Sequence, residues 1–172
     1  MGDRFKFTRL LLLAILQAIG FILIVVATPL DLLHTWGTDV CYGLFGEKKS
    51  CGVYGVSITN TSWGCTRRKV TMIIAASFGI ASILFSLIAT IMAFLQYFRV
   101  FLLRWGLFII TLMTNITLLV TWACVADVFH RRMCGGSTGL GAVYFYGPAF
   151  GLIVFTWALE LIIFILAALI TF

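Results

Sequence analysis

Four of the five cysteines lie in two polar intervals of a chain that is otherwise almost continuously apolar. These four, the residues best suited to covalent chemistry, are Cys41, Cys51, Cys65 and Cys134. Thiols gathered on one side of a membrane are typical of disulfides in an oxidising compartment. Clustered thiols can also bind zinc, but the absence of a Cys-x-x-Cys pair disfavours that alternative. The sequence therefore predicts two disulfides, no metal and no cofactor, and it leaves the pairing open.

A second chemically distinctive residue is Glu160, an acid inside the last long apolar segment. Counting about 1.5 Å per helical residue from Pro148 places Glu160 near the middle of a bilayer, where an acid costs a few kcal/mol. Asn115 reaches a similar depth in its own segment, and Gln17 lies somewhat nearer the cytoplasm. We expect these three side chains to form a buried polar cluster. A structural role is favoured over an ion or proton pathway, because no second buried acid or base is available as a relay.

Catalysis is poorly supported by the remaining residues. The two histidines, His34 and His130, both lie in polar intervals. Neither a nucleophile elbow nor a phosphate-binding loop is present, so we do not expect an enzyme. Each histidine is most simply a solvated loop residue. The alternative is that they titrate in an acidic vacuole, since an unperturbed imidazole changes charge at about pH 6.5.

The elements that must position these residues follow from composition. With 62% hydrophobic and 10% charged residues, the chain is typical of a membrane protein. Crossing a bilayer takes about 20 apolar helical residues. Spans are predicted at residues 10–30, 70–96, 105–126 and 148–172. No interval has room for a separate soluble domain, so 1–172 is predicted to be a single domain. The first span could instead be a cleaved signal peptide, but its length favours retention.

Orientation follows from the cysteines and a sequon at Asn60, all of which fall in the intervals 31–69 and 127–147. An acceptor asparagine must be reachable from the lumen, so these intervals are predicted to be outer loops and both termini cytoplasmic. The short segments on the other side are dense in basic residues, which agrees with this orientation. A basic outer face is formed by Arg67, Arg68, Lys69, Arg131 and Arg132. It suits lipid headgroups or acidic glycans, or merely flanks the spans; no nucleic-acid module is present.

The first outer loop alternates β-branched, aromatic and glycine residues, which predicts short strands, with a chain reversal at the charged turn 46–49. In the spans, small residues predict close helix packing. They recur at Ala75, Gly79, Ser82, Ser86, Ala89 and Ala93 in the second span, and at Thr114, Thr117, Thr121 and Cys124 in the third. A solute path along the threonines is the less favoured alternative, because such seams are ordinary in helix packing.

The interval between Cys41 and Cys51 resembles the signature of the amastin family, the four-span surface proteins of kinetoplastid parasites. The matching residues are Cys41, Tyr42, Leu44, Phe45, Gly46, Lys48 and Cys51. Gly43 and Ser50 depart from the signature and place the chain in a divergent branch. The loop is also similar to the broader claudin superfamily, through Trp36 and the run 43–45. This second resemblance implies a Cys51–Cys65 bridge, with Cys41 left for Cys134 or both unpaired.

Together these patterns predict an all-α membrane protein: a four-transmembrane-helix bundle with a small extracellular β-sheet formed by the first outer loop. The resemblance implies a plasma-membrane protein that presents a disulfide-braced outer face. Besides the lipid bilayer, the expected partners are host-cell or vacuolar membrane components or a second copy of the chain. Sealing contact between adjacent membranes, as in claudins, is a further option. The alternative is a small proton, ion or solute transporter or channel that uses Glu160 and the threonine seam.

Overall fold

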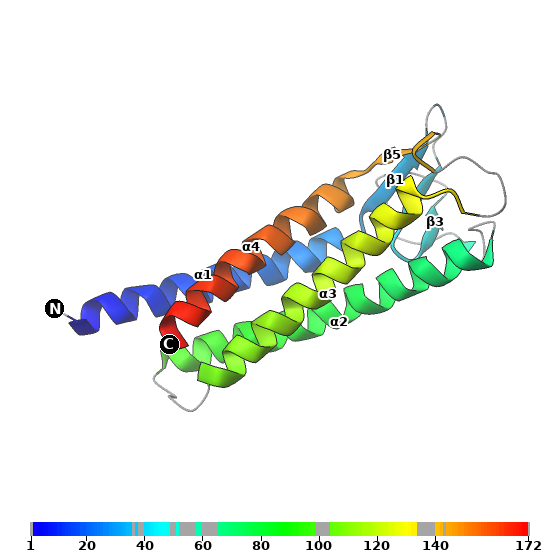
Figure 1. Ribbon diagram of the computed structural model, residues 1–172. Coiled ribbons are helices and arrows are strands. Elements are labelled where there is room, and N and C mark those ends of the chain that lie inside the picture. The colour runs from blue at the N-terminus through cyan, green and yellow to red at the C-terminus, as the bar shows by residue number, and fades with distance from the viewer. Residues whose placement is uncertain are drawn as a thin grey trace.

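Four long helices form a bundle in the computed structural model of the chain (Figure 1). They are α1 (Gly2–Ala27), α2 (Thr66–Tyr97), α3 (Arg104–His130) and α4 (Pro148–Thr171). The structure describes residues 2–35, 37, 40–48, 51, 58–59, 65–98, 104–133, 140–142 and 144–171. All four helices are long and apolar enough to cross a membrane. Each contacts its two neighbours in the cyclic order α1, α2, α3, α4. The chain termini lie at one end of the bundle, the termini end, and the strands lie at the other, the sheet end (Figure 1).

The helix ends differ from the predicted spans. α1 ends at Ala27 because Pro29 follows, and a residue that precedes proline disfavours the helical conformation. α2 begins at Thr66 and thereby includes the basic residues before position 70, while α3 continues to His130. Counting apolar residues finds the part of a helix inside the bilayer, but a helix can continue into water, where charges carry no penalty.

A five-stranded antiparallel sheet caps the sheet end. Its strands are β1 (Asp31–Thr35), β2 (Cys41–Gly43), β3 (Gly46–Lys48), β4 (Ile58–Thr59) and β5 (Tyr144–Tyr146), in the order β4-β3-β2-β1-β5. The predicted strands of the first outer loop are confirmed. The fifth strand was missed: it comes from the connection between α3 and α4 and pairs with β1. A short 3-10 helix, Leu140–Ala142, lies before it.

The predicted reversal at 46–49 was wrong by a few residues. The chain turns at Leu44 and Phe45, and Gly46 already belongs to β3, where it pairs with Thr59. Gly46 has a φ of 152°, a conformation that favours glycine, which is why β3 can begin directly after the turn. Lys48 therefore lies in a strand opposite Cys41 and not at the tip of a charged loop.

Small residues line the buried side of α2, as the seam predicted. All six are buried, and Gly79 makes room for Leu44: a Cβ at position 79 would lie 2.7 Å from Leu44 Cδ2. Leu44 is only 2% exposed and belongs to a core that joins the sheet to all four helices. A second apolar core lies nearer the termini end, around Leu13, Leu107 and Ile163. The sheet is thus packed into the top of the bundle.

Gly147 joins β5 to α4 with almost no space around it. Its N–H donates a hydrogen bond to the Leu32 carbonyl at 2.7 Å. A Cβ at this position would clash with the backbone carbonyl of Asp31 and lie 2.9 Å from His34 Cδ2. Backbone atoms cannot move aside as a flexible side chain can, so glycine is required here.

We expect Gly147→Ala to lower the free energy of unfolding by about 1–3 kcal/mol, the usual cost of overpacking a close-packed site. Gly151→Ala is the matched control, because it lies four residues further along in α4 and an added Cβ there meets nothing within 4 Å. Thermal unfolding of both variants in detergent micelles would check this. Equal stability of the two variants would show that the junction is looser than described.

Candidate functional site

Glu160 is completely buried inside the bundle, where it contacts residues from the other three helices. Gln17 Nε2 of α1 donates to Glu160 Oε1 at 2.8 Å, and the Ser86 hydroxyl of α2 lies 3.5 Å from the same oxygen. Asn115 Nδ2 of α3 donates to the backbone carbonyl of Glu160 at 3.1 Å. The structure therefore brings together the three residues of the expected polar cluster and adds Ser86, which was predicted only as part of the small-residue seam.

Space and hydrogen bonding in this cluster are both tight. Gly20 lies beside the carboxyl group, where an added Cβ would be 3.0 Å from Glu160 Oε1. Three buried oxygens of the described cluster have no hydrogen-bond partner: Glu160 Oε2, Gln17 Oε1 and Asn115 Oδ1. All three are acceptors, so a proton on Glu160 would supply a donor that the cluster lacks. Chemically, the cluster can hold a proton or connect the four helices.

The threonine seam of α3 does not offer its hydroxyls to a solute. Thr114 donates to the Ile110 carbonyl at 3.0 Å, Thr117 to Met113 at 3.0 Å, and Thr121 to Thr117 at 2.8 Å. Each hydroxyl is satisfied by its own helix, the usual arrangement for such residues inside a membrane helix. Cys124 continues the seam as a free thiol.

At the sheet end, Lys48 and Asp31 form a buried ion pair. Lys48 Nζ lies 2.8 Å from Asp31 Oδ1, the two side chains are only 4% and 3% exposed, and Nζ also donates to the Pro29 carbonyl. Gly43 leaves room for the lysine stem, since a Cβ there would lie 3.3 Å from Lys48 Cε. This pair was not predicted from the sequence, because Asp31 directly follows an apolar run and meets Lys48 only across the strands.

Several signature residues likewise point into the fold. Cys41, Leu44 and Lys48 are 0%, 2% and 3% exposed. Phe45 is half-buried against the core, and the Tyr42 hydroxyl lies 3.5 Å from Glu47 Oε2. Burial raises the pKa of Tyr42 far above its ordinary value, so its phenol stays neutral. Much of the signature therefore describes how the sheet is built and seated.

Cys41 and Cys51 form a disulfide, with their Cα atoms 5.5 Å apart. The implied Cys51–Cys65 bridge was therefore wrong: β2 and β3 run back together and return Cys51 to Cys41, a closeness that spacing alone could not decide. Cys65 is also disulfide-bonded. Cys134 and the sequon at Asn60 lie outside the described residues.

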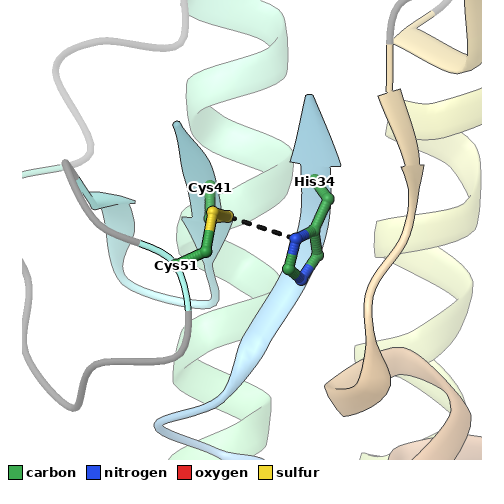
Figure 2. A group of neighbouring side chains, drawn as sticks. All are labelled: His34, Cys41 and Cys51. Carbon is green, nitrogen blue, oxygen red and sulfur yellow. Dashed lines mark hydrogen bonds between the residues drawn. A yellow bond between two sulfur atoms is a disulfide. The ribbon is translucent and has the colours of Figure 1, made fainter. Parts of the chain in front are cut away.

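His34 lies beside this disulfide, in β1 next to β2 (Figure 2). Its Nδ1 is 3.3 Å from Cys41 Sγ, and its Nε2 is 3.9 Å from Asp31 Oδ2. The Phe145 ring of β5 stacks on the imidazole with centroids 5.3 Å apart. His34 is 23% exposed and held by its neighbours, unlike the solvated loop residue that the sequence predicted.

The same three residues could in principle hold a metal. The ligand atoms of His34, Cys41 and Cys51 lie within 4.8 Å of one another. Metal ions bind thiolates, however, and both sulfurs are consumed in the disulfide. The arrangement in this structure is therefore an imidazole facing a disulfide.

His130 ends α3 and faces β5. Its Nε2 lies 3.2 Å from the Tyr146 hydroxyl, and burial raises the pKa of Tyr146. The Tyr146 ring stacks between Phe129 and Phe150, with centroids 4.0 Å away on each side. These contacts fix β5 to α3 and α4.

The basic residues of the predicted outer face lie at the first turns of α2 and the end of α3, both at the sheet end (Figure 1). Arg67, Arg131 and Arg132 are exposed, whereas Arg68 and Lys69 are half-buried. Arg131 pairs with Asp127 at 3.1 Å in a largely exposed contact. Together with Phe145, which is 41% exposed on β5, these residues make the described surface of the sheet end both basic and aromatic.

Comparison with models of known protein families matches this chain to one family. The model of the family described as Amastin surface glycoprotein matches residues 18–166, which run from α1 to α4 and include every strand. A search of the curated proteins found no match.

Proposed function

Because the chain belongs to the Amastin family of surface glycoproteins, we propose that this multi-pass protein displays its five-stranded sheet outside the plasma membrane as a contact face. In this arrangement both termini are cytoplasmic, since they lie at the opposite end of the bundle (Figure 1). The disulfides favour the same orientation, because an oxidising exterior preserves them.

The main support for this proposal is that covalent and ionic contacts hold the sheet firmly in place. The Cys41–Cys51 disulfide closes the β2–β3 hairpin, and the Lys48–Asp31 pair ties β3 to the start of β1. β5 closes the other side and continues directly into α4. A preorganised surface loses little conformational entropy on binding, so this construction suits repeated contact with a partner.

The surface chemistry favours acidic headgroups on a facing membrane as the partner. Arg67, Arg131 and Arg132 are exposed at the sheet end, and Phe145 adds an aromatic ring to the same end. Each basic side chain near an anionic membrane surface contributes about 1 kcal/mol, and aromatic rings favour the headgroup region.

The orientation can be tested with an epitope inserted at Gly37. This residue lies in the turn after β1, is exposed with a φ of 74°, and has open space where a side chain would stand. Antibody should bind intact cells that carry this insertion, whereas an epitope fused to the amino terminus should bind only after permeabilisation. The reverse pattern would invert the topology and remove the proposal.

The contact itself can be tested with proteoliposomes. Protein in neutral phosphatidylcholine vesicles should capture vesicles that contain phosphatidylserine, and capture should weaken at high salt because exposed charges are screened. Changing Arg67, Arg131 and Arg132 to Gln should reduce capture by about 1 kcal/mol per residue. Arg9→Gln is the control, since Arg9 is exposed near the opposite end of the bundle. Equal capture by both variants would refute a role for the basic face.

A second candidate function, proton or ion transport through the bundle, is favoured by one observation: three buried oxygens around Glu160 have no donor. The self-satisfied threonine hydroxyls of α3 count against a solute path that uses them. Flux into reconstituted vesicles separates the two functions.

A further inference from the structure

We propose that the Cys41–Cys51 disulfide is a thiol-exchange site, in which an external thiol attacks Cys51 and His34 receives Cys41 as the leaving sulfur. The site would take molecules that carry a thiolate and hold them as a mixed disulfide on Cys51. This proposal rests on the geometry around the two sulfurs and is independent of whether the sheet contacts another membrane.

The two cysteine residues differ in exposure. Cys41 lies in β2 and is 0% exposed, whereas Cys51 follows β3 and is partly exposed. Thiol–disulfide exchange requires the attacking thiolate to approach the sulfur atom directly, so access decides which sulfur reacts. Cys51 is the accessible one, and Cys41 is the sulfur that must depart.

His34 is placed at the sulfur that departs. Its Nδ1 lies 3.3 Å from Cys41 Sγ, and Figure 2 shows the imidazole directed at that atom from the neighbouring strand. A disulfide sulfur accepts only a weak hydrogen bond, but a thiolate accepts a strong, charge-assisted one. The contact between His34 Nδ1 and Cys41 Sγ therefore strengthens as the disulfide breaks. A thiolate that is better stabilised is a faster leaving group.

The groups around the imidazole hold it beside the disulfide. Asp31 Oδ2 lies 3.9 Å from Nε2, while the other oxygen of that carboxylate is paired with Lys48 of β3. Phe145 of β5 stacks on one face of the ring. Among the described residues, Asp31 and Lys48 are therefore the charged groups that face this site, and the carboxylate is the nearer of the two.

The step balances as a simple exchange. A thiolate forms a bond to Cys51 Sγ, the Cys41–Cys51 bond breaks, and its electron pair goes to Cys41 Sγ, which takes a hydrogen bond or a proton from His34 Nδ1. The product is a mixed disulfide on Cys51 and a free Cys41. A second thiol can then attack the mixed disulfide and leave both cysteines reduced, or Cys41 can attack Cys51 and restore the original bond.

Glutathione is a suitable probe, used with the whole folded protein in detergent micelles. After a brief reaction and an acid quench, peptide mass spectrometry should find the glutathione adduct on Cys51 and a free thiol at Cys41. The disulfide that contains Cys65 serves as an internal control and should open more slowly. An adduct on Cys41, or earlier opening at Cys65, would overturn the proposal without requiring any variant to fold.

The role of His34 has its own test. His34→Gln should slow exchange about tenfold, while His130→Gln, which alters the other histidine, should leave the rate unchanged. Opening of the disulfide that contains Cys65 should be equally fast in the wild type and in His34→Gln, because the sulfur that His34 contacts is that of Cys41. Equal exchange rates at Cys51 in the wild type and in His34→Gln would exclude His34 from the reaction.

Discussion

Replacing Lys48 with methionine is expected to lower the free energy of unfolding by about 3–5 kcal/mol, because one partner of a buried ion pair is removed. The Asp31 carboxylate is 3% exposed at its side chain and would lose its contact with Lys48 Nζ. The lysine also donates to the Pro29 carbonyl, so the exit from α1 would lose a hydrogen bond as well. Chemical unfolding followed by circular dichroism in mixed micelles would measure the change.

Two controls make this prediction specific. Arg131→Met removes one partner of the exposed pair with Asp127, and exposed pairs contribute only about 0–1 kcal/mol. Changing Asp31 to Leu together with Lys48 to Met should recover most of the loss, since a buried pair can often be replaced by apolar residues at little cost. If Lys48→Met were as mild as Arg131→Met, the lysine would not be buried in the folded protein.

The second large effect is expected at Glu160. Glu160→Ala should destabilise the bundle by about 2–4 kcal/mol, because it opens a cavity and removes the acceptor of the Gln17 amide. Glu160→Gln keeps the volume and can still accept from Gln17, so its stability should stay within about 1 kcal/mol of the wild type. Unfolding of both variants in mixed micelles would measure the difference, and equal losses would show that only the carboxylate matters.

The same pair of variants separates structure from transport. If the cluster only connects the four helices, reconstituted Glu160→Gln should show the same vesicle proton and sodium permeability as the wild type. A flux present in the wild type and absent in a stable, correctly folded Glu160→Gln would make transport the function. Glu160→Ala cannot decide this question, because loss of the fold would also abolish a flux.

The depth of polar side chains in the bilayer could be predicted from the sequence, but the contacts between strands could not. Glu160, Asn115 and Gln17 were placed together by counting residues along apolar helices, where rise per residue is fixed. The helix pattern and the strands of the first loop were likewise predictable from their periodicity. The run Tyr144–Tyr146 carried a strand signal of aromatic residues, but it was included in the second outer loop without a strand and so was missed.

The pairings that build the sheet end depend on register, which a single sequence does not specify. Because the chain turns at Leu44 and Phe45, Lys48 lies opposite Cys41 and its side chain points inward to Asp31. A shift of one residue would have reversed every side chain in the strand. The same register brings Cys51 to Cys41, so one physical reason explains why the disulfide pairing stayed open in the sequence and why the buried ion pair was missed.

The position of β1 between β2 and β5 sets an order of events during biosynthesis. The strand is made soon after the first helix, yet one of its edges stays unoccupied until the ribosome has passed residue 146. During that interval two further helices must enter the membrane while β1 keeps exposed hydrogen-bonding groups. Maturation of the cap is therefore a late step, and chains arrested before the fourth helix would leave an open edge for chaperones to recognise.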